Sequence, residues 1–387
     1  MNTAETLIYL TACYMNNVTA KLDNVNWDLL YAFSKGHNMS ALTADALKKT
    51  EAFNNADEAE RKRWTSLLNS AIKRTILFNA ERKRITDHLE EQGIWHIPLK
   101  GAVLNDMYPC FGTREFADND ILYDGAYSDS VKEWMISQGY KMRNDSYVAD
   151  EFAKPPLYNF EMHSTLFRER KGAENRIAFY KGMLERKVPE KGKKFSFRMS
   201  NEDFYIYFII HAHKHYDARG TGLRTVADEY VIMHCDKLRF DREFVDSELK
   251  KLGLTEFEAT LCSLAEKLFS FPEKAYNARE TLNGDEHKML NLILTCGTFG
   301  KMDNMIKKEL DPDSESKNLS KRKYYLKRIF PGVSRYRYTN PFVYKHKIVY
   351  PFFWVYRTTV YPIAHRRELK KEINAVNQIK KSSGGKK

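Results

Sequence analysis

The feature that most constrains the fold is a change in the spacing of apolar residues, from helical to alternating and back to helical. Residues 1–92 carry apolar side chains at helical spacing, which ends near Gly93. Residues 93–200 hold short runs of β-forming residues between glycine turns, and helical spacing returns at Asn201. This order predicts an α+β fold in which a small mixed sheet is flanked by helical domains.

A chain of 387 residues is longer than one compact domain usually is, so we expect several domains. We predict a helical N-terminal cap over residues 1–92, an α/β module over 93–200 and a helical domain over 201–320. Residues 307–321 are polar and predict a linker or loop. Residues 321–387 form a basic, aromatic C-terminal segment, and its last residues, KKSSGGKK, are predicted to be disordered.

The positive charge of the chain is concentrated in this C-terminal segment. The whole chain has a formal net charge of +12, and residues 321–387 hold 18 Lys and Arg against 2 Asp and Glu, a net of +16. The rest therefore has a net charge of −4. The segment could bind RNA, DNA or an anionic membrane surface. Its aromatic residues could stack on bases, lie at a lipid interface or pack on the body: Tyr324, Tyr325, Phe342, Phe352, Phe353 and Trp354.

The sequence predicts a cytoplasmic protein, with peripheral attachment to a membrane as an alternative. Residues 348–364 are apolar and aromatic, but Arg357 and two prolines interrupt them, and they are too short to span a bilayer. They could lie on a membrane surface. The N-terminus has an acidic residue, Glu5, within its short apolar stretch, unlike a signal peptide. The five cysteines lack CxxC spacing, which argues against a zinc site or a disulfide framework.

A phosphate-binding turn is predicted near the start of the α/β module. Residues 95–99 form a short apolar run that predicts a strand, and a helical pattern follows directly. Lys100 and Gly101 lie between them, where backbone amides can donate to phosphate oxygens and Lys100 adds a positive charge. Arg114 follows and could hold a phosphate through two parallel hydrogen bonds.

Two carboxylates on the next strand predict a metal site. Side chains alternate along a strand, so Asp118 and Asp120 project from the same side, about 7 Å apart. Such a pair repels itself unless a cation lies between the carboxylates. The same alternation in residues 158–165 places Glu161 on a polar face. If that strand lies beside the first, the three acids can hold two magnesium ions, with manganese as an alternative.

The runs IPLKGAVLNDMYPCFGTREFADNDILYD and NFEMHSTLF resemble the bacterial family of uncharacterised nucleotidyltransferases, which has the DNA polymerase β superfold. The family pattern is an LKG turn, an R-x-x-x-D-x-D strand and a later acid-x-His strand, and the resemblance covers most of the chain. It implies that Asp118, Asp120 and Glu161 are metal ligands and that Gly101 lies at the phosphate turn. It also places five residues at recurrent positions expected to line the cleft: His163, His211, His215, Arg224 and Asp228.

His211 and His215 lie one helical turn apart, a spacing that zinc sites use. No HExxH acid and no sulfur ligand accompanies them in the sequence. We therefore favour structural or substrate-facing histidines over a zinc site.

The resulting hypothesis is a metal-dependent nucleotidyltransferase that moves an NMP from an NTP, such as ATP, to an unidentified hydroxyl or phosphate acceptor and releases pyrophosphate. Glu161 would orient the metal ion on the nucleophile side and assist deprotonation. One alternative is a catalytically silent protein that senses nucleotide and docks on membrane or RNA through its basic segment. Another is transfer of the γ-phosphate. Without its context, the D-x-D pair would be a solvated surface feature.

Overall fold

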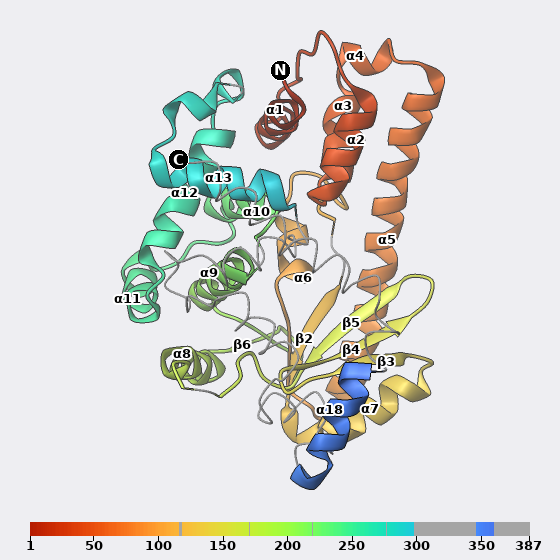
Figure 1. Ribbon diagram of the computed structural model, residues 1–387, viewed down its shortest axis with the longest axis vertical. Helices are drawn as coiled ribbons and strands as arrows, with labels where there is room; N and C mark the ends of the chain where they lie inside the picture. The colour runs from red at the N-terminus through yellow and green to blue at the C-terminus, as the bar shows by residue number, and fades with distance from the viewer. Residues whose placement is uncertain (116–117, 170, 219, 276, 298–345, 360–387) are drawn as a thin grey trace. The chain divides into compact units, whose positions relative to one another are not determined.

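A computed structural model describes residues 1–297, apart from 116–117, 170, 219 and 276, and residues 346–359. The chain forms two compact units, one made of Met1–Asp217 with Thr221–Phe299 and the other of Ala218–Gly220 with Gly300–Lys387. The polar stretch 307–321 lies outside the described residues, as does most of the basic C-terminal segment. The elements below belong to the first unit unless stated otherwise (Figure 1).

A set of helices precedes the sheet: α1 (Thr3–Met15), α2 (Trp27–Gly36), α3 (Ser40–Lys48), α4 (Glu51–Asn54) and α5 (Glu58–Glu91). Helix α5 begins after Asp57, whose carboxylate accepts a hydrogen bond from the Glu60 amide at 2.8 Å. It ends just before Gly93, whose φ of +71° is left-handed. The predicted helical N-terminal region and its end near Gly93 are therefore confirmed.

The central residues form a five-stranded mixed sheet in the order β1-β2-β5-β4-β3 (Figure 1). The strands are β1 (His96–Pro98), β2 (Asn119–Tyr123), β3 (Lys141–Asp145), β4 (Ala149–Lys154) and β5 (Tyr158–His163). Neighbouring strands are antiparallel except β2 and β5, which are parallel. Short helical segments follow β1 and β2: α6 (Gly101–Leu104), a 3-10 turn (Asn105–Met107) and α7 (Ser128–Ser137). The predicted α+β fold with a small mixed sheet and helical flanks is confirmed.

The two faces of the sheet differ in polarity. One face is buried under α5 and α7 and carries Ile121, Tyr123, Phe160 and Met162. Phe78 of α5 stacks on Phe160, with ring centroids 6.0 Å apart. Burying a ring of this size contributes roughly 2 to 3 kcal/mol. Because side chains alternate along each strand, Asp120 and Glu161 lie on the opposite face, as the sequence predicted.

A second set of helices follows the sheet: α8 (Glu174–Glu185), α9 (Asn201–Ala218), α10 (Leu223–Met233), α11 (Arg242–Leu252), α12 (Thr255–Phe269) and α13 (Gly284–Cys296). Apolar residues at helical spacing in 203–217, 223–238, 257–269 and 287–296 predict four helices, and α9, α10, α12 and α13 match them. The sequence did not predict α8, where only Phe179 and Met183 are buried. It also missed α11, where only Val245 and Leu249 are buried among charged residues. Two buried residues per helix give a periodicity in the sequence that is too weak to predict a helix.

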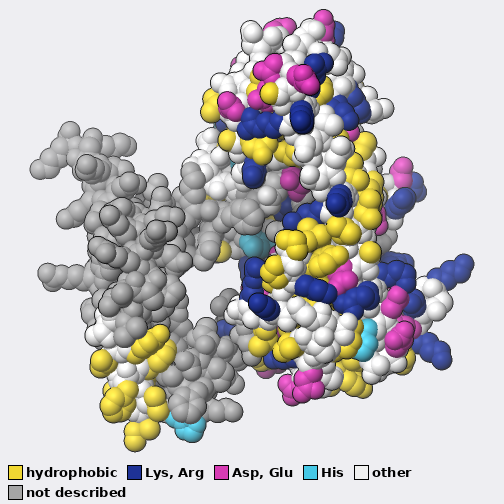
Figure 2. All heavy atoms as spheres, turned by 90° about the vertical axis from the view of Figure 1, so that its right-hand side faces the viewer, with side chains coloured by type: hydrophobic (Ala, Val, Ile, Leu, Met, Phe, Trp, Pro, Cys, Tyr) yellow, Lys and Arg dark blue, Asp and Glu magenta, His cyan; other side chains and the backbone are white. Residues whose placement is uncertain are grey.

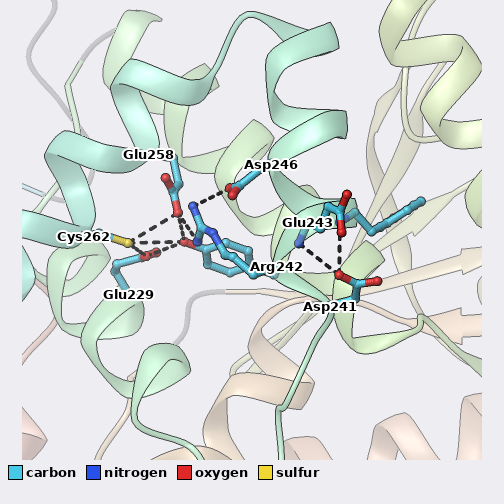
Figure 3. Close-up of polar contacts among 9 residues, drawn as sticks. Glu229, Asp241, Arg242, Glu243, Asp246, Glu258 and Cys262 are labelled. Carbon is cyan, nitrogen blue, oxygen red and sulfur yellow. Dashed lines mark hydrogen bonds and ion pairs between the residues drawn. The ribbon is translucent and has the colours of Figure 1, made fainter.

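A buried polar network joins α9, α10, α11 and α12 (Figure 3). The Tyr205 hydroxyl lies 2.7 Å from Oε1 of both Glu229 and Glu258. Cys262 donates to Glu229 Oε1 at 2.8 Å, and Arg242 donates to Glu258 Oε1 at 2.7 Å. These contacts fix α9 and α10 against α12, and α9 and α10 carry the predicted cleft histidines and Arg224.

The atoms of this network are spaced for hydrogen bonds and not for a metal ion. Glu229, Glu258 and Cys262 each offer a ligand atom within 4.8 Å of the others. Ligand atoms around one metal ion are roughly 3 Å or more apart, whereas Cys262 Sγ and Glu229 Oε1 are 2.8 Å apart, a hydrogen-bond distance. Arg242 supplies one positive charge for two carboxylates. Burial raises the pKa of Glu229 to about 7, so this carboxyl keeps a proton in mildly acidic solution.

We expect Glu229→Gln to reduce the dependence of stability on pH. A carboxyl whose pKa is raised in the folded state destabilises the fold as pH rises from about 4.5 to above 7, since ionisation is easier in the unfolded chain. The free energy of unfolding should therefore fall between pH 5 and pH 8 by roughly 1 to 3 kcal/mol more in the wild type than in the variant. Urea unfolding at both pH values measures this. Glu256→Gln, at an exposed position of α12, is the control; equal pH slopes in all three proteins would contradict the prediction.

Figure 2 shows the face that contains α5, where Lys and Arg side chains are spread among acidic and hydrophobic ones. In the second unit, α18 (Tyr350–Thr359) exposes apolar side chains, including Phe352 at 74%. The C-terminal aromatics Tyr324, Tyr325 and Phe342 lie outside the described residues. Within the described ranges, no helix is long and apolar enough to cross a membrane.

Candidate functional site

A cavity of about 660 Å³ lies on the polar face of the sheet. It is lined by residues of the sheet, of the turn after β1, of α8, α9 and α10, and of the loop between β5 and α8. Its volume is in the range of small-molecule binding sites. Every site residue predicted from the sequence lines it: Lys100, Gly101, Arg114, Asp118, Asp120, Glu161, His163, His211, His215, Arg224 and Asp228.

The parallel pairing of β2 with β5 places Asp120 directly opposite Glu161. His163 lies two residues further along β5, and its Nε2 atom is 3.0 Å from Asp120 Oδ1 and 3.5 Å from Glu161 Oε2. The three side chains offer ligand atoms within 4.8 Å of one another. Although burial disfavours the imidazolium, its hydrogen bonds to Asp120 and Glu161 raise the pKa of His163.

Asp118 lies just before β2 and lines the same cavity, but it is not part of the compact group formed by Asp120, Glu161 and His163. Burial, together with the negative charges of Asp120 and Glu161, raises the pKa of Asp118 to about 6. The three acids are therefore close enough to repel one another, as the sequence predicted. His163 is closer to Asp120 than its predicted role as a cleft-lining residue required.

Lys100 is the nearest lysine to this group, with its Nζ atom 3.3 Å from Asp120 Oδ2 and 5.7 Å from the centre of the Tyr207 ring. Burial disfavours the ammonium, but Asp120 and its neighbours outweigh burial and raise the pKa of Lys100. The backbone of Lys100 is left-handed, with a φ of +32°, which directs the chain from β1 into α6. One oxygen of Asp120 thus contacts the Lys100 ammonium and the other contacts the His163 imidazole.

The sequence assigned two parallel hydrogen bonds from Arg114 to a phosphate, but in the structure the Nε–Nη2 edge of this guanidinium binds a carboxylate instead. Its Nε and Nη2 atoms donate to Asp228 at 2.7 and 2.9 Å, and the Tyr108 hydroxyl donates to the same carboxylate at 2.7 Å. Arg114 is only 5% exposed and Asp228 4%. Nη1 of Arg114 has no hydrogen-bond partner among the described residues. The N–H groups of Arg114 left for a phosphate are therefore the two of Nη1 and the second one of Nη2.

His211 and His215 lie on the face of α9 that lines the cavity. Their Nε2 atoms are 2.9 Å apart. Burial, with the positive charge of Lys100, lowers the pKa of His215 to about 4 and that of His211 well below its usual value. Two neutral imidazoles so close share one hydrogen bond, and no carboxylate or thiol joins them in a metal-binding group within the described residues.

Several residues of the cavity were not singled out in the sequence, among them Tyr207 and Lys214 of α9. Tyr207 lies in the apolar run of α9, where it resembles a core residue, and Lys214 lies between the two histidines. Tyr207 is one and two helical turns before His211 and His215, so helical spacing alone places all three on one face. The sequence feature that would have identified these residues is a polar face on an otherwise apolar helix.

The donor set fits a divalent metal ion. Asp118, Asp120 and Glu161 supply hard oxygen ligands, the type that magnesium and manganese prefer. His163 adds a nitrogen next to two of them. Three acids lining one cavity repel one another, and this repulsion favours a bound cation. Lys100 and His163 both contact the Asp120 carboxylate, so a metal ion must compete with them for its oxygens.

We expect Lys100→Met to increase the affinity for Mn²⁺ by roughly tenfold, because the ammonium that neutralises Asp120 is removed. Electron paramagnetic resonance of free Mn²⁺ measures the binding without nucleotide. Lys132→Met removes a lysine that contacts Asp150 and does not line the cavity, so its affinity should stay at the wild-type value. Weaker Mn²⁺ binding by Lys100→Met would show that the ammonium does not compete.

We expect Asp228→Asn to lower the free energy of unfolding by about 3 kcal/mol, because it leaves the buried Arg114 guanidinium without its counter-charge. Asp246→Asn is the control, since Asp246 pairs with Arg242 at 2.8 Å where both side chains are about half exposed. That change should cost less than about 1 kcal/mol. Urea unfolding measures both, and equal effects would refute a special role of the buried pair.

A comparison with family models matches residues 23–270 to a family described as uncharacterised nucleotidyltransferase. The match covers nearly two thirds of the chain and includes every residue of the cavity named above. Searches of curated proteins and of solved structures found no match.

Proposed function

The chain belongs to the family of uncharacterised nucleotidyltransferases, and we propose that it moves an NMP from an NTP to a hydroxyl or phosphate acceptor. The reaction would depend on magnesium or manganese ions at Asp118, Asp120 and Glu161 and would release pyrophosphate. The observation that carries the proposal is the register of β2 and β5, which pairs Asp120 with Glu161 at the wall of the cavity. Carboxylates from two adjacent strands suit the metal ions of phosphoryl chemistry.

The metal ions would supply positive charge to the phosphates and lower the pKa of the attacking group. The acceptor oxygen would form a bond to the α-phosphorus, and the bond from that phosphorus to the bridging oxygen of the β-phosphate would break. The bonding electrons would leave with pyrophosphate. With a hydroxyl acceptor, Glu161 is the base we propose, since its side chain is 28% exposed and therefore accessible from the cavity.

Lys100 and Gly101 remain the proposed contacts for the triphosphate. Lys100 lies at the cavity wall with its ammonium next to Asp120. The ammonium can leave Asp120 for an incoming phosphate oxygen and so stay paired with a negative charge. Arg114 can contribute Nη1 and the second N–H of Nη2, because its Nε–Nη2 edge holds Asp228. Its main proposed role is to hold the chain before β2 against α10.

A catalytically silent nucleotide sensor is the second candidate. The observation that favours it is the engagement of both Asp120 oxygens by His163 and Lys100, which can replace a metal ion. A cytoplasmic location stays a prediction. So does docking of the basic segment 321–387 on an anionic membrane or a nucleic acid, since most of that segment lies outside the described residues.

The decisive experiment uses NTPs labelled at the α-phosphate, with magnesium and host-cell extract as the source of acceptor. We expect the wild type to label a new acceptor and the Asp118→Asn/Asp120→Asn variant to lose at least about a thousandfold in rate, as when a metal site is removed. Asp246→Asn/Asp285→Asn changes two exposed aspartates by the same charge and should keep wild-type activity.

Other outcomes separate the alternatives. Label that moves only from the γ-phosphate indicates phosphotransfer. If no label moves but magnesium-dependent NTP binding is present in the wild type and absent in the Asp118→Asn/Asp120→Asn variant, the sensor function is supported. Absence of NTP binding would refute the site assignment itself.

A further inference from the structure

Two arginines line one end of the cavity, and one of them has no hydrogen-bonded carboxylate among the described residues. Arg114 and Arg224 both line the cavity there. Asp228 binds Arg114 through two hydrogen bonds. Arg224 donates to the backbone carbonyl of Glu115, a neutral group, by a short hydrogen bond. Glu115 and Asp118 interact with Arg224 electrostatically, whereas Asp228 is the carboxylate that is hydrogen-bonded to this pair of arginines.

One buried hydrogen-bond donor at this end of the cavity, Nη1 of Arg114, indicates that a ligand binds there. Arg114 is 5% exposed, and its Nη1 atom is buried without a hydrogen-bond partner among the described residues. An unpaired donor of a buried charged group costs free energy, so such atoms are usually paired with protein, water or ligand. Burial and the charge of Arg114 both lower the pKa of Arg224, which shows that the two guanidinium groups repel each other. An anion between them would relieve both costs.

Hydroxyl groups complete the lining. Thr221 and Thr225 lie at the cavity wall, and their Oγ1 atoms are 2.6 Å apart. One hydroxyl donates to the other, which leaves one hydroxyl hydrogen free to donate elsewhere. Together with the arginine N–H groups, this end offers more donors than the two oxygens of a carboxylate need. Three terminal oxygens of a phosphate ester match it better.

The opposite end of the cavity has its own cations. Arg176 of α8 and Lys214 of α9 line it. Lys214 interacts electrostatically with Glu161 and Asp120, whereas Arg224 interacts with Asp118. Asp120 and Glu161 thus interact with a cation of α9 and Asp118 with one of α10, and a transferase that joins two substrates at its metal site needs a binding region for each of them.

We propose that Arg114, Arg224 and Thr225 bind the phosphate ester of the acceptor, and that the triphosphate of the NTP binds at the end with Lys214 and Arg176. The inference deepens the proposed function and rests on it. The acceptor is then a small phosphorylated molecule, whose phosphate is held by the two arginines while its reacting oxygen faces Asp118, Asp120 and Glu161.

The binding experiment is a calorimetric titration of inorganic phosphate into protein saturated with magnesium and α,β-methylene-ATP, which cannot transfer its nucleotide. We expect one phosphate to bind the wild-type complex. Arg224→Gln should weaken phosphate at least tenfold and change nucleotide affinity less than about twofold. Arg176→Gln, the matched control at the other end, should weaken the nucleotide and leave phosphate unchanged.

Two further variants keep the test independent of folding. Arg224→Lys keeps the positive charge and should retain more phosphate binding than Arg224→Gln. Thr225→Val removes one hydroxyl and should weaken phosphate several-fold without affecting the nucleotide. Thermal unfolding of each variant verifies that it is folded. The proposal is overturned if phosphate fails to bind the nucleotide complex, or if Arg224→Gln and Thr225→Val weaken the nucleotide instead.

A second measurement tests the acceptor directly. Host-cell extract is treated with phosphatase, the phosphatase is removed, and labelled NTP and enzyme are then added. We expect label transfer to disappear, since the acceptor has lost its phosphate. Transfer that persists at the wild-type rate contradicts a phosphorylated acceptor while leaving nucleotidyl transfer established. If α,β-methylene-ATP does not bind the wild type at all, the proposed function fails, and that result is distinct from a failure of the phosphate subsite alone.

Discussion

The parallel pairing of β2 with β5 is the constraint on which the site depends. It sets Asp120 beside Glu161 and, on the other face, sets Ile121 beside Met162 under α5. Because the side-chain period of a strand is two, a shift by one residue would exchange the acids with the core. The burial of the apolar face therefore also fixes the position of the acids, and folding energy and site geometry cannot be separated here.

Neighbouring side chains of the protein itself stabilise the buried acidic group. Lys100 and His163 contact the two oxygens of Asp120, and further out Arg114 is paired with Asp228. Burying acids without such partners would cost several kcal/mol each. The same contacts mean that ligands exchange with internal partners and do not simply fill an empty space. Binding of metal and nucleotide is thus coupled to small rearrangements of side chains.

The sequence predicted the sheet, the helical region before it and the acids and histidines of the cavity because each left a local signal. Alternation in β5 was enough to place Glu161 on a polar face, and the spacing of His211 and His215 was enough to place them together. Contacts between distant segments left no such signal. The pairing of Arg114 with Asp228 joins residues 114 positions apart, and only the packing of α10 against the turn before β2 reveals it. Short spacing rules cannot supply this kind of information.

Helix α5 has 34 residues, which corresponds to a rod of roughly 50 Å. Trp64 and Leu68 near its start pack into the core of the N-terminal helices, while Ile85 and Leu89 near its end pack into the core of the sheet. Helix α5 is therefore part of both hydrophobic cores and does more than connect the N-terminal helices to the sheet. A fragment cut after residue 92 to isolate the sheet would lose α5 from the apolar face and keep only α7 there, so a fragment that keeps this core intact must include α5.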